Sequence, residues 1–265
     1  MSSAGKASPN TTDPYGQSGF SIRFDWGLQG ATAISAGAAA IVVVDVLSFT
    51  TTLSVALDAG IEIYPYRFRD ASAAAFAATR GAVLAVGRRE AGPTGVSLSP
   101  VSVRRAIEPG GPLTVTNKLV LPSPNGAAIC RQLGEANALV VGASLRNASA
   151  CAEWVAKAVR GPVAVVAAGE RWPGDVLRPA VEDLWGAGLV IDTLASLSGG
   201  QVSPEAASAR AAYRALGRTP AMALAACASG RELSEAGYGE EIAVAAEIDV
   251  SHRVPVLAGE AFRVG

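Results

Sequence analysis

The stretch AAIVVVDVLSFTTTLSVALDAG, residues 39–60, decides the fold class. It opens with an apolar, β-branched run that ends at Asp45, which is typical of a strand buried on both faces of a parallel sheet. Residues 50–59 then carry apolar side chains at helical spacing, and Gly60 ends that helix. A buried strand followed directly by a helix is the repeating unit of α/β proteins, so the stretch predicts an α/β fold.

The same rhythm continues along the chain and predicts a sheet covered by helices on both faces. Strands are expected at 21–26, 39–44, 61–64, 82–86, 113–116, 138–142, 163–167 and 254–257. Helices are expected at 50–59, 71–79, 124–133, 146–159, 179–197, 204–216 and 220–229. The segment 87–111 is rich in Gly, Pro and Ser and is expected to be a long loop.

The domain organisation follows from composition along the chain. Residues 1–19 are polar and rich in Ser, Gly, Pro, Asn and Thr, so we expect a flexible N-terminal tail and no secretory signal. No linker interrupts residues 20–265, which we expect to form a single domain. No apolar run is long enough for a membrane helix. We therefore expect a cytoplasmic protein without a membrane partner.

Charge and residue counts exclude several function classes. The formal net charge is −1, so the chain lacks the excess of basic residues that is typical of nucleic-acid binding, and no nucleic-acid partner is expected. The only histidine, His252, rules out zinc hydrolases that need several imidazoles, and we interpret it as a surface residue. Any metal should be a hard, oxygen-ligated ion such as Mg²⁺. Three scattered cysteines (Cys130, Cys151 and Cys227) indicate buried free thiols in a reducing compartment.

Residues that follow the predicted strands are the candidates for chemistry, because α/β sheets bind ligands at the carboxyl ends of their strands. Asp45 follows one strand and could hold a cation, while Thr50, Thr51 and Thr52 open the next helix and could hold an anion. The alternative is that Ser48 or Thr50 only caps the helix.

A second candidate is the Ser-Pro-Asn-Gly loop at 123–126. Its prolines stiffen the chain, and Gly126 permits a close approach to a ligand. Ser123 and Asn125 could thus line an anion pocket, or the segment could be a rigid turn with Ser123 as a helix cap. The acidic segment 229–249 could equally be part of a functional site or a solvent-exposed surface.

A third candidate combines Glu170, at a predicted strand end, with Glu182 and Asp183 near the start of a helix. Acidic residues in a first helical turn are ordinary partners of the helix dipole. Here they lie beside Arg178 and a glycine-rich stretch, which favours a binding site and tight packing of that helix on the sheet.

Familiar hydrolase motifs are missing. The chain has no Gly-x4-Gly-Lys-Ser/Thr loop, no Cys-x5-Arg loop and no Gly-x-Ser-x-Gly elbow. The strand-end Asp45 is followed two positions later by Leu47, so the paired aspartates of aspartyl-phosphate enzymes are also missing.

Seven motifs in order resemble the 2-phosphosulfolactate phosphatase family from about residue 20 to the end. They are Asp-Val-Leu-x-x-Thr-Thr at 45–51, Ser-Pro-Asn-Gly at 123–126, Gly-Glu at 169–170, Glu-Asp-Leu-Trp-Gly-Ala-Gly at 182–188, Ser-Gly-Arg-Glu-Leu at 229–233, Gly-Tyr-x-Glu-Glu at 237–241 and Val-Pro at 254–255. The resemblance implies a three-layer α/β/α fold with a mixed, largely parallel sheet. It also implies an Mg²⁺-dependent phosphatase that converts 2-phosphosulfolactate to sulfolactate and phosphate, a step toward coenzyme M.

The chain departs from the family pattern at two places. The family usually has an arginine where this chain has Ser48, and Gly-Asn-Ser-Pro where this chain has residues 96–100 without the asparagine. Both places should contact substrate, so sulfolactate specificity is open. Replacement positive charge could come from four arginines: Arg88, Arg89, Arg171 and Arg178.

We therefore predict an Mg²⁺-dependent phosphatase acting on a small phosphorylated acid. Asp45 and Glu170 are the predicted catalytic residues, and Asp45, Glu182 and Asp183 the predicted metal ligands. The predicted substrate-binding residues are Thr50, Thr51, Thr52, Ser123, Asn125, Gly126 and Arg178. Two alternatives stay open: a lyase or isomerase acting on a small carboxylic acid, and a non-catalytic phospho-ligand sensor. The abundance of Ala and Gly in the helices also allows a homodimer.

Overall fold

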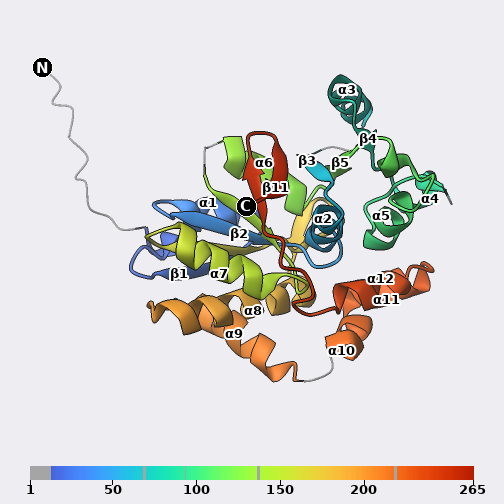
Figure 1. Cartoon of the computed structure of the whole chain (residues 1–265). Coiled ribbons are helices and arrows are strands. Elements are labelled where there is room, and N and C mark those ends of the chain that lie inside the picture. The colour runs from blue at the N-terminus through green and yellow to red at the C-terminus, as the bar shows by residue number, and fades with distance from the viewer. Residues whose placement is uncertain (1–12, 68–69, 93, 136–137, 218–219) are drawn as a thin grey trace, which may run out of the picture.

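The computed structural model describes residues 13–67, 70–92, 94–135, 138–217 and 220–265 (Figure 1). A nine-stranded sheet in the order β1-β7-β2-β6-β10-β11-β3-β5-β4 forms its centre. Its strands are β1 (Ile22–Trp26), β2 (Ala40–Val44), β3 (Glu62–Tyr66), β4 (Val83–Leu84), β5 (Lys118–Pro122), β6 (Val140–Ala143), β7 (Val163–Ala167), β10 (Pro255–Ala258) and β11 (Ala261–Val264). A separate hairpin pairs β8 (Glu170–Trp172) with β9 (Val176–Arg178).

The helices lie on both sides of this sheet (Figure 1). They are α1 (Gly27–Ser35), α2 (Phe49–Asp58), α3 (Ala71–Arg80), α4 (Arg88–Ala91), α5 (Pro100–Ala106), α6 (Gly126–Glu135), α7 (Ala148–Ala158), α8 (Val181–Ser198), α9 (Pro204–Ala215), α10 (Pro220–Ala226), α11 (Ala228–Glu235) and α12 (Glu240–Ala245). The predicted three-layer α/β/α class is confirmed. No helix of the described segments combines the length and apolarity needed to cross a membrane.

The sheet is mixed and largely parallel, as expected. Strands β1, β7, β2 and β6 pair in parallel, and so do β3, β5 and β4. The C-terminal hairpin β10–β11 pairs antiparallel with β6 on one side and with β3 on the other. The end of the chain therefore joins the two parallel groups into one sheet.

Strand β2 shows why the decisive stretch is apolar without interruption. Ile41 and Val43 belong to the core that contains residues of α1, α2 and α6, whereas Val42 and Val44 belong to the core that contains residues of α7, α8 and α9. Both faces of β2 are fully buried, so alternation with polar residues would place a polar side chain inside a core.

Glycines bring α8 close to its neighbours, as the sequence predicted. A Cβ at Gly186 would lie 2.8 Å from side-chain atoms of Val44 and Val46. A Cβ at Gly188 would lie 2.2 Å from the carbonyl oxygen of Ala209 in α9. Helix α8 can therefore pack on β2 and α9 only because these positions lack a side chain.

Several predicted elements were wrong. The expected strand at 113–116 is replaced by a 3₁₀ helix (Pro112–Thr114), and the strand lies later, at β5. The expected loop at 87–111 contains α4 and α5, and the expected helix at 220–229 is two helices, α10 and α11. Helices α1 and α12 and strands β8, β9 and β11 were not predicted. Short elements such as these are fixed by tertiary contacts more than by local pattern.

The described part of the N-terminal segment contacts the sheet. A 3₁₀ helix spans Pro14–Gly16, and the Gln17 side chain exchanges two hydrogen bonds with the backbone of Phe24 in β1. The flexibility of residues 1–19 stays a prediction. Positions 1–12 of that prediction lie outside the described residues.

Candidate active site

Asp45, directly after β2, is held where two helices begin. Its Oδ1 accepts a hydrogen bond from the Phe49 N–H of α2 at 3.2 Å, and its Oδ2 accepts one from the Gly126 N–H of α6 at 2.9 Å. The side chain of this residue is 5% exposed. Two backbone donors at helix N-termini favour the ionised carboxylate and fix its orientation.

The approach of α6 to Asp45 depends on Gly126. A Cβ at this position would lie 2.6 Å from Asp45 Oδ2 and 2.7 Å from Phe49 Cδ1. The glycine of the 123–126 loop thus serves a close contact, as expected, but with a carboxylate of the protein itself. Ser123 is buried, and its Oγ accepts a hydrogen bond from the Asn125 N–H at 3.3 Å, which is a turn contact.

Asp183, in the first turn of α8, joins the ends of two neighbouring strands. Its Oδ1 accepts from the Val46 N–H after β2 at 2.7 Å, and its Oδ2 accepts from the Gly169 N–H after β7 at 2.8 Å. Burial, together with the charges of Asp45 and Glu182, raises the pKa of Asp183 well above its usual range, against the effect of the two N–H donors. Asp183 therefore holds together the two backbone segments that carry Asp45 and Glu170.

Glu170, the first residue of β8, faces the same acidic cluster. Burial and the Asp45 charge raise its pKa to about 7, with a smaller contribution from Glu182. The Asn125 amide opposes this shift by donating to Glu170 Oε2 at 3.0 Å, and the Arg178 charge opposes it as well. A carboxyl group with a pKa near neutrality can accept or donate a proton at working pH.

Glu182 lies in the same turn of α8 and is 2% exposed. Burial and the Glu182 charge raise the pKa of the Cys227 thiol to about 11. The four predicted carboxylates are thus close enough to interact electrostatically, and three of them (Asp45, Glu182 and Asp183) are almost fully buried.

The loop at 123–126 is tied to the β8–β9 hairpin by Arg171. Its Nε donates to Asn125 Oδ1 at 3.0 Å, and its Nη2 donates to the Pro124 carbonyl at 2.8 Å. Asn125 consequently bridges Arg171 and Glu170. The structure brings the second and third predicted regions together through these contacts.

The three predicted threonines lie beside Asp45 but inside the protein. Thr50, Thr51 and Thr52 are 0% exposed. The Thr50 hydroxyl donates to the Asp45 carbonyl at 2.7 Å, and the N-cap residue Ser48 makes no side-chain capping bond, so the capping alternative is wrong. The hydroxyls of Thr51 and Thr52 have no partner among the described residues. Their assignment to substrate stays a prediction.

A cavity of about 540 Å³ opens over Glu170. Its wall carries four arginines, Arg88, Arg89, Arg171 and Arg178, together with Ser229 and Tyr238 of the C-terminal helices. Arg178 Nη2 lies 3.3 Å from Ser229 Oγ, and its guanidinium lies 5.6 Å from the Trp172 ring centre. Glu90 and Glu232 also line the cavity, so its four arginines face three glutamates. The arginines can still bind a small substrate with several negative charges beside Glu170.

A second, larger cavity of about 1020 Å³ meets the first one at Glu170 and Arg171. Apolar residues of α1 and the β8–β9 hairpin, among them Leu28, Val176 and Leu177, line much of it. Its apolar lining suits phosphate less well than the arginine-rich cavity does.

The segment 229–249 stayed open between a site and a solvated surface, and no role was assigned to its residues. In the structure Ser229 and Tyr238 line the arginine-rich cavity, and Glu241 holds Arg88 through two hydrogen bonds. The motifs at 229–233 and 237–241 indicated that the segment matters, but nothing local reveals that Glu241 pairs with a residue 153 positions away.

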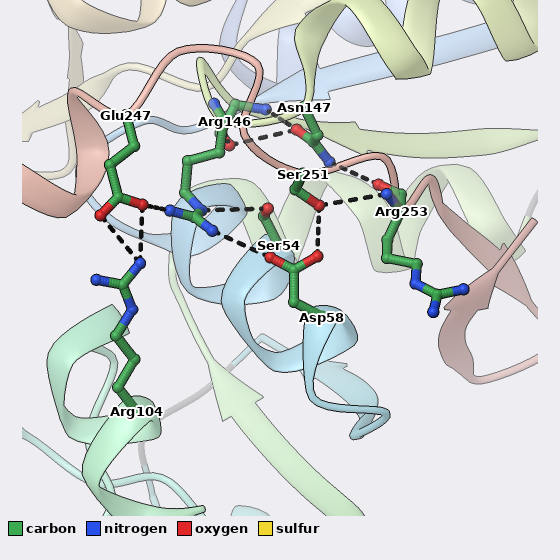
Figure 2. Close-up of polar contacts among 9 residues, drawn as sticks. Ser54, Asp58, Arg104, Arg146, Asn147, Glu247, Ser251 and Arg253 are labelled. Atoms are coloured by element: carbon green, nitrogen blue, oxygen red, sulfur yellow. Dashed lines mark hydrogen bonds and ion pairs between the residues drawn. The ribbon is translucent and has the colours of Figure 1, made fainter.

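A second polar network, shown in Figure 2, attaches the C-terminal segment to the core. Arg146, after β6, is 4% exposed. Its Nη2 donates to Asp58 Oδ2 of α2 at 3.0 Å, and its Nη1 pairs with Glu247. Glu247 also accepts from Arg104 Nη2 at 2.8 Å, and Ser251 Oγ donates to Asp58. These contacts fix the position of the helices that carry Ser229 and Glu241.

The acidic cluster meets the requirements of Mg²⁺ only in part. Within the described segments, no three His, Cys, Asp or Glu side chains are placed to hold one metal ion. Mg²⁺, however, usually keeps several waters and takes one or two carboxylates plus substrate phosphate. The negative charges of Asp45 and Glu182, which raise the pKa of Glu170 and of Asp183, are what a divalent cation would neutralise.

Comparisons with known proteins agree on one family. The sequence model of the 2-phosphosulpholactate phosphatase family matches residues 30–260. A protein of Thermus thermophilus named "Probable 2-phosphosulfolactate phosphatase" is 31% identical over 230 residues, which is 85% of this chain and 89% of the relative. A protein of Deinococcus radiodurans with the same name is 28% identical over 218 residues, covering 81% of this chain and 86% of the relative.

Proposed function

The chain belongs to the 2-phosphosulpholactate phosphatase family, and from this membership and the site geometry we propose that it hydrolyses 2-phosphosulfolactate to sulfolactate and phosphate. The observation that carries the proposal is Glu170. This carboxyl, with a pKa of about 7, lies in an arginine-lined cavity next to the buried carboxylate of Asp45. A proton-transfer group beside an anion-binding wall is what hydrolysis of a phosphomonoester requires.

The proposed mechanism uses the arginines to bind and Glu170 to transfer a proton. Arg178, whose positive charge lowers the pKa of Glu170, orients the phosphoryl group. Water attacks phosphorus, the bond from phosphorus to the ester oxygen breaks, and the protonated form of Glu170 donates to the leaving oxygen. The protons of the attacking water stay on the new phosphate, which returns one of them to Glu170. Asn125, which donates to Glu170 Oε2, keeps that carboxyl directed at the reacting group.

We propose further that the enzyme depends on Mg²⁺ bound at the acidic cluster. One or two of the carboxylates Asp45, Glu182 and Asp183 would hold the ion, with water and substrate phosphate as its other ligands, and Mg²⁺ would neutralise charge on the phosphoryl oxygens. The support is the closeness of the carboxylates: the charges of Asp45 and Glu182 raise the pKa of both Glu170 and Asp183, and a bound cation would offset that repulsion.

The test is phosphate release from 2-phosphosulfolactate with Mg²⁺ and with EDTA. The expected result is Mg²⁺-dependent release that falls by at least about a thousandfold in Asp45→Ala, since a group that organises the reacting centre is removed. Activity of Asp45→Ala within about tenfold of the unmodified protein would contradict the role of Asp45. A folded sample that releases no phosphate would favour the lyase or sensor alternative.

A further inference from the structure

Arg88, at the start of α4, is held in one orientation by two elements. Its Nε and Nη2 donate to Glu241 Oε1 and Oε2 of α12 at 2.8 and 2.7 Å. Its Nη2 also donates to Ser48 Oγ, at the start of α2, at 2.5 Å. The guanidinium lies 5.6 Å from the centre of the Tyr238 ring. A two-pronged bond to a carboxylate that is 2% exposed fixes both position and plane.

The fixed guanidinium belongs to a residue that lines the arginine-rich cavity. Its Nη1 makes no hydrogen bond within the segments that the structure describes, whereas Nε and Nη2 are both occupied. Arg88 shares the cavity wall with Glu170 and Arg178. Arginine cannot lose its proton in proteins, so Nη1 is a permanent donor at this wall.

The second contact of the guanidinium, with Ser48, ties Arg88 to a different part of the chain. Ser48 immediately precedes α2 and lies 40 residues before Arg88. Its neighbour Leu47 lines the same cavity as Arg88. Arg88 is therefore anchored both to α12 and to the start of α2, and its positive charge has a fixed place at the wall of this cavity.

We propose that Arg88, oriented by Glu241 and Ser48, binds the acidic group of the substrate that is remote from the scissile bond. The positive charge of Arg178 lowers the pKa of Glu170, and the proposed mechanism assigns Arg178 to the phosphoryl group. Of the other three arginines on this wall, Arg88 is the one that a buried carboxylate holds in place, so we assign it to a sulfonate or carboxylate on the same molecule. This inference rests on the proposed phosphatase function. Arg88 is a specificity-determining residue, and Glu241 is a positioning residue.

The kinetic test compares substrates with and without the remote acid. Arg88→Ala should raise KM for 2-phosphosulfolactate by about tenfold more than KM for p-nitrophenyl phosphate, because a charge-assisted hydrogen bond is lost only with the former. Measuring 2-phospholactate, which has the carboxylate but no sulfonate, identifies the group that Arg88 binds. Equal changes in KM for all three substrates would overturn the proposal.

A binding measurement separates this inference from the proposed function. Titration calorimetry with sulfolactate requires no turnover, and Arg88→Ala should weaken its binding by about tenfold or more. If the unmodified protein releases no phosphate but binds sulfolactate through Arg88, the phosphatase proposal fails and the anion site stands. If sulfolactate binds both proteins equally, or neither, the role of Arg88 is wrong whatever the activity.

Three further variants test how Arg88 is held. Glu241→Gln keeps the shape of the side chain but weakens its two hydrogen bonds with Arg88. It should therefore weaken sulfolactate binding, but less than Arg88→Ala does. Ser48→Arg added to Arg88→Ala should restore binding, because it places a guanidinium at the start of α2, where Arg88 contacts Ser48. Arg105→Ala is the matched control, because the Arg105–Glu240 pair joins the neighbouring α5 to α12 and is exposed.

These controls also exclude a simple loss of structure. Arg105→Ala should bind sulfolactate like the unmodified protein, while Arg88→Ala should not. If Ser48→Arg fails to restore binding and Arg105→Ala weakens it as much as Arg88→Ala does, the ion pairs of α12 only support the fold and the proposal is overturned.

Discussion

The N–H of Gly126 donates to the Oδ2 of Asp45 at 2.9 Å, although the two residues are 81 positions apart. This bond connects the start of α6 to the end of β2. Helix α6 can come this close only because residue 126 has no side chain. The orientation of the central carboxylate thus depends on a residue that performs no chemistry.

Gly126→Ala should therefore damage both stability and turnover. The new methyl group would lie 2.6 Å from Asp45 Oδ2, so either the carboxylate or the helix must move. We expect a loss of about 2 kcal/mol in the free energy of unfolding from the overpacked contact. Misplacing the carboxylate should cost at least about a hundredfold in kcat. Urea denaturation and phosphate release measure the two effects.

Gly19→Ala is the control for this variant, because a Cβ there meets nothing within 4 Å. It should change neither quantity. An active, fully stable Gly126→Ala protein would show that α6 can withdraw without disturbing Asp45.

Glu170→Gln should stabilise the protein at alkaline pH. The folded state raises the pKa of this carboxyl from 4.5 to about 7, so the folded protein binds the proton more tightly than the unfolded chain. The free energy of unfolding consequently falls as pH rises from about 4.5 through 7, by up to about 3 kcal/mol. Glutamine does not ionise, so the variant does not lose this free energy of unfolding at high pH. Its side-chain oxygen still accepts the hydrogen bond from Asn125.

Thermal or urea unfolding at pH 4.5 and pH 8 checks this expectation. The variant should match the unmodified protein at pH 4.5, exceed its stability at pH 8, and lose phosphatase activity. Equal stability of the two proteins at pH 8 would mean that Glu170 titrates normally in the folded state.

Arg146→Met should be the most destabilising change in the network of Figure 2. It removes a buried cation that pairs with Asp58 and Glu247, and both carboxylates are one-third exposed. We expect a loss of about 2–3 kcal/mol, less than for a fully buried pair because water can still reach the two acids. The midpoint of urea denaturation measures it.

Arg105→Ala offers a comparison within the same part of the fold. Its ion pair with Glu240 is more than half exposed on both sides, so removal should cost less than about 1 kcal/mol. Similar losses for the two variants would indicate that burial of Arg146 does not matter.

Mg²⁺ should raise the melting temperature of the protein, and Glu182→Gln should reduce that shift. A ligand that binds only the folded state stabilises it by about 2.7 kcal/mol at one hundred times its dissociation constant. Glu240→Gln, on an exposed carboxylate, should keep the full shift. A shift that survives unchanged in Glu182→Gln would place the cation elsewhere.

Sequence patterns predicted the parts of this structure that repeat locally. The buried run 40–44 and the long helices have clear periodicity, and the fold class follows from their alternation. The strand at 118–122 was missed because its neighbours 113–116 have the same apolar character. Helix α12 and strand β11 are short, and contacts with distant parts of the chain determine them.

The site was predictable to the extent that strand ends carry acidic residues. Asp45, Glu170, Glu182 and Asp183 were identified from position alone, and the structure places them within electrostatic reach of one another. The position of a residue in the sequence does not reveal which side chain it contacts in the fold. The orientation of Arg88 depends on Glu241, and no pattern in one sequence connects them.

The two oxygens of Asp183 touch chain segments that follow different strands, β2 and β7, from a third element, α8. Asp45 and Glu170 are therefore correctly spaced only when all three elements have docked. A partly assembled chain could contain most of the native secondary structure and still have no catalytic geometry. Turnover is thus a stricter reporter of complete folding than circular dichroism, and recovery of activity during refolding should lag behind recovery of helix content.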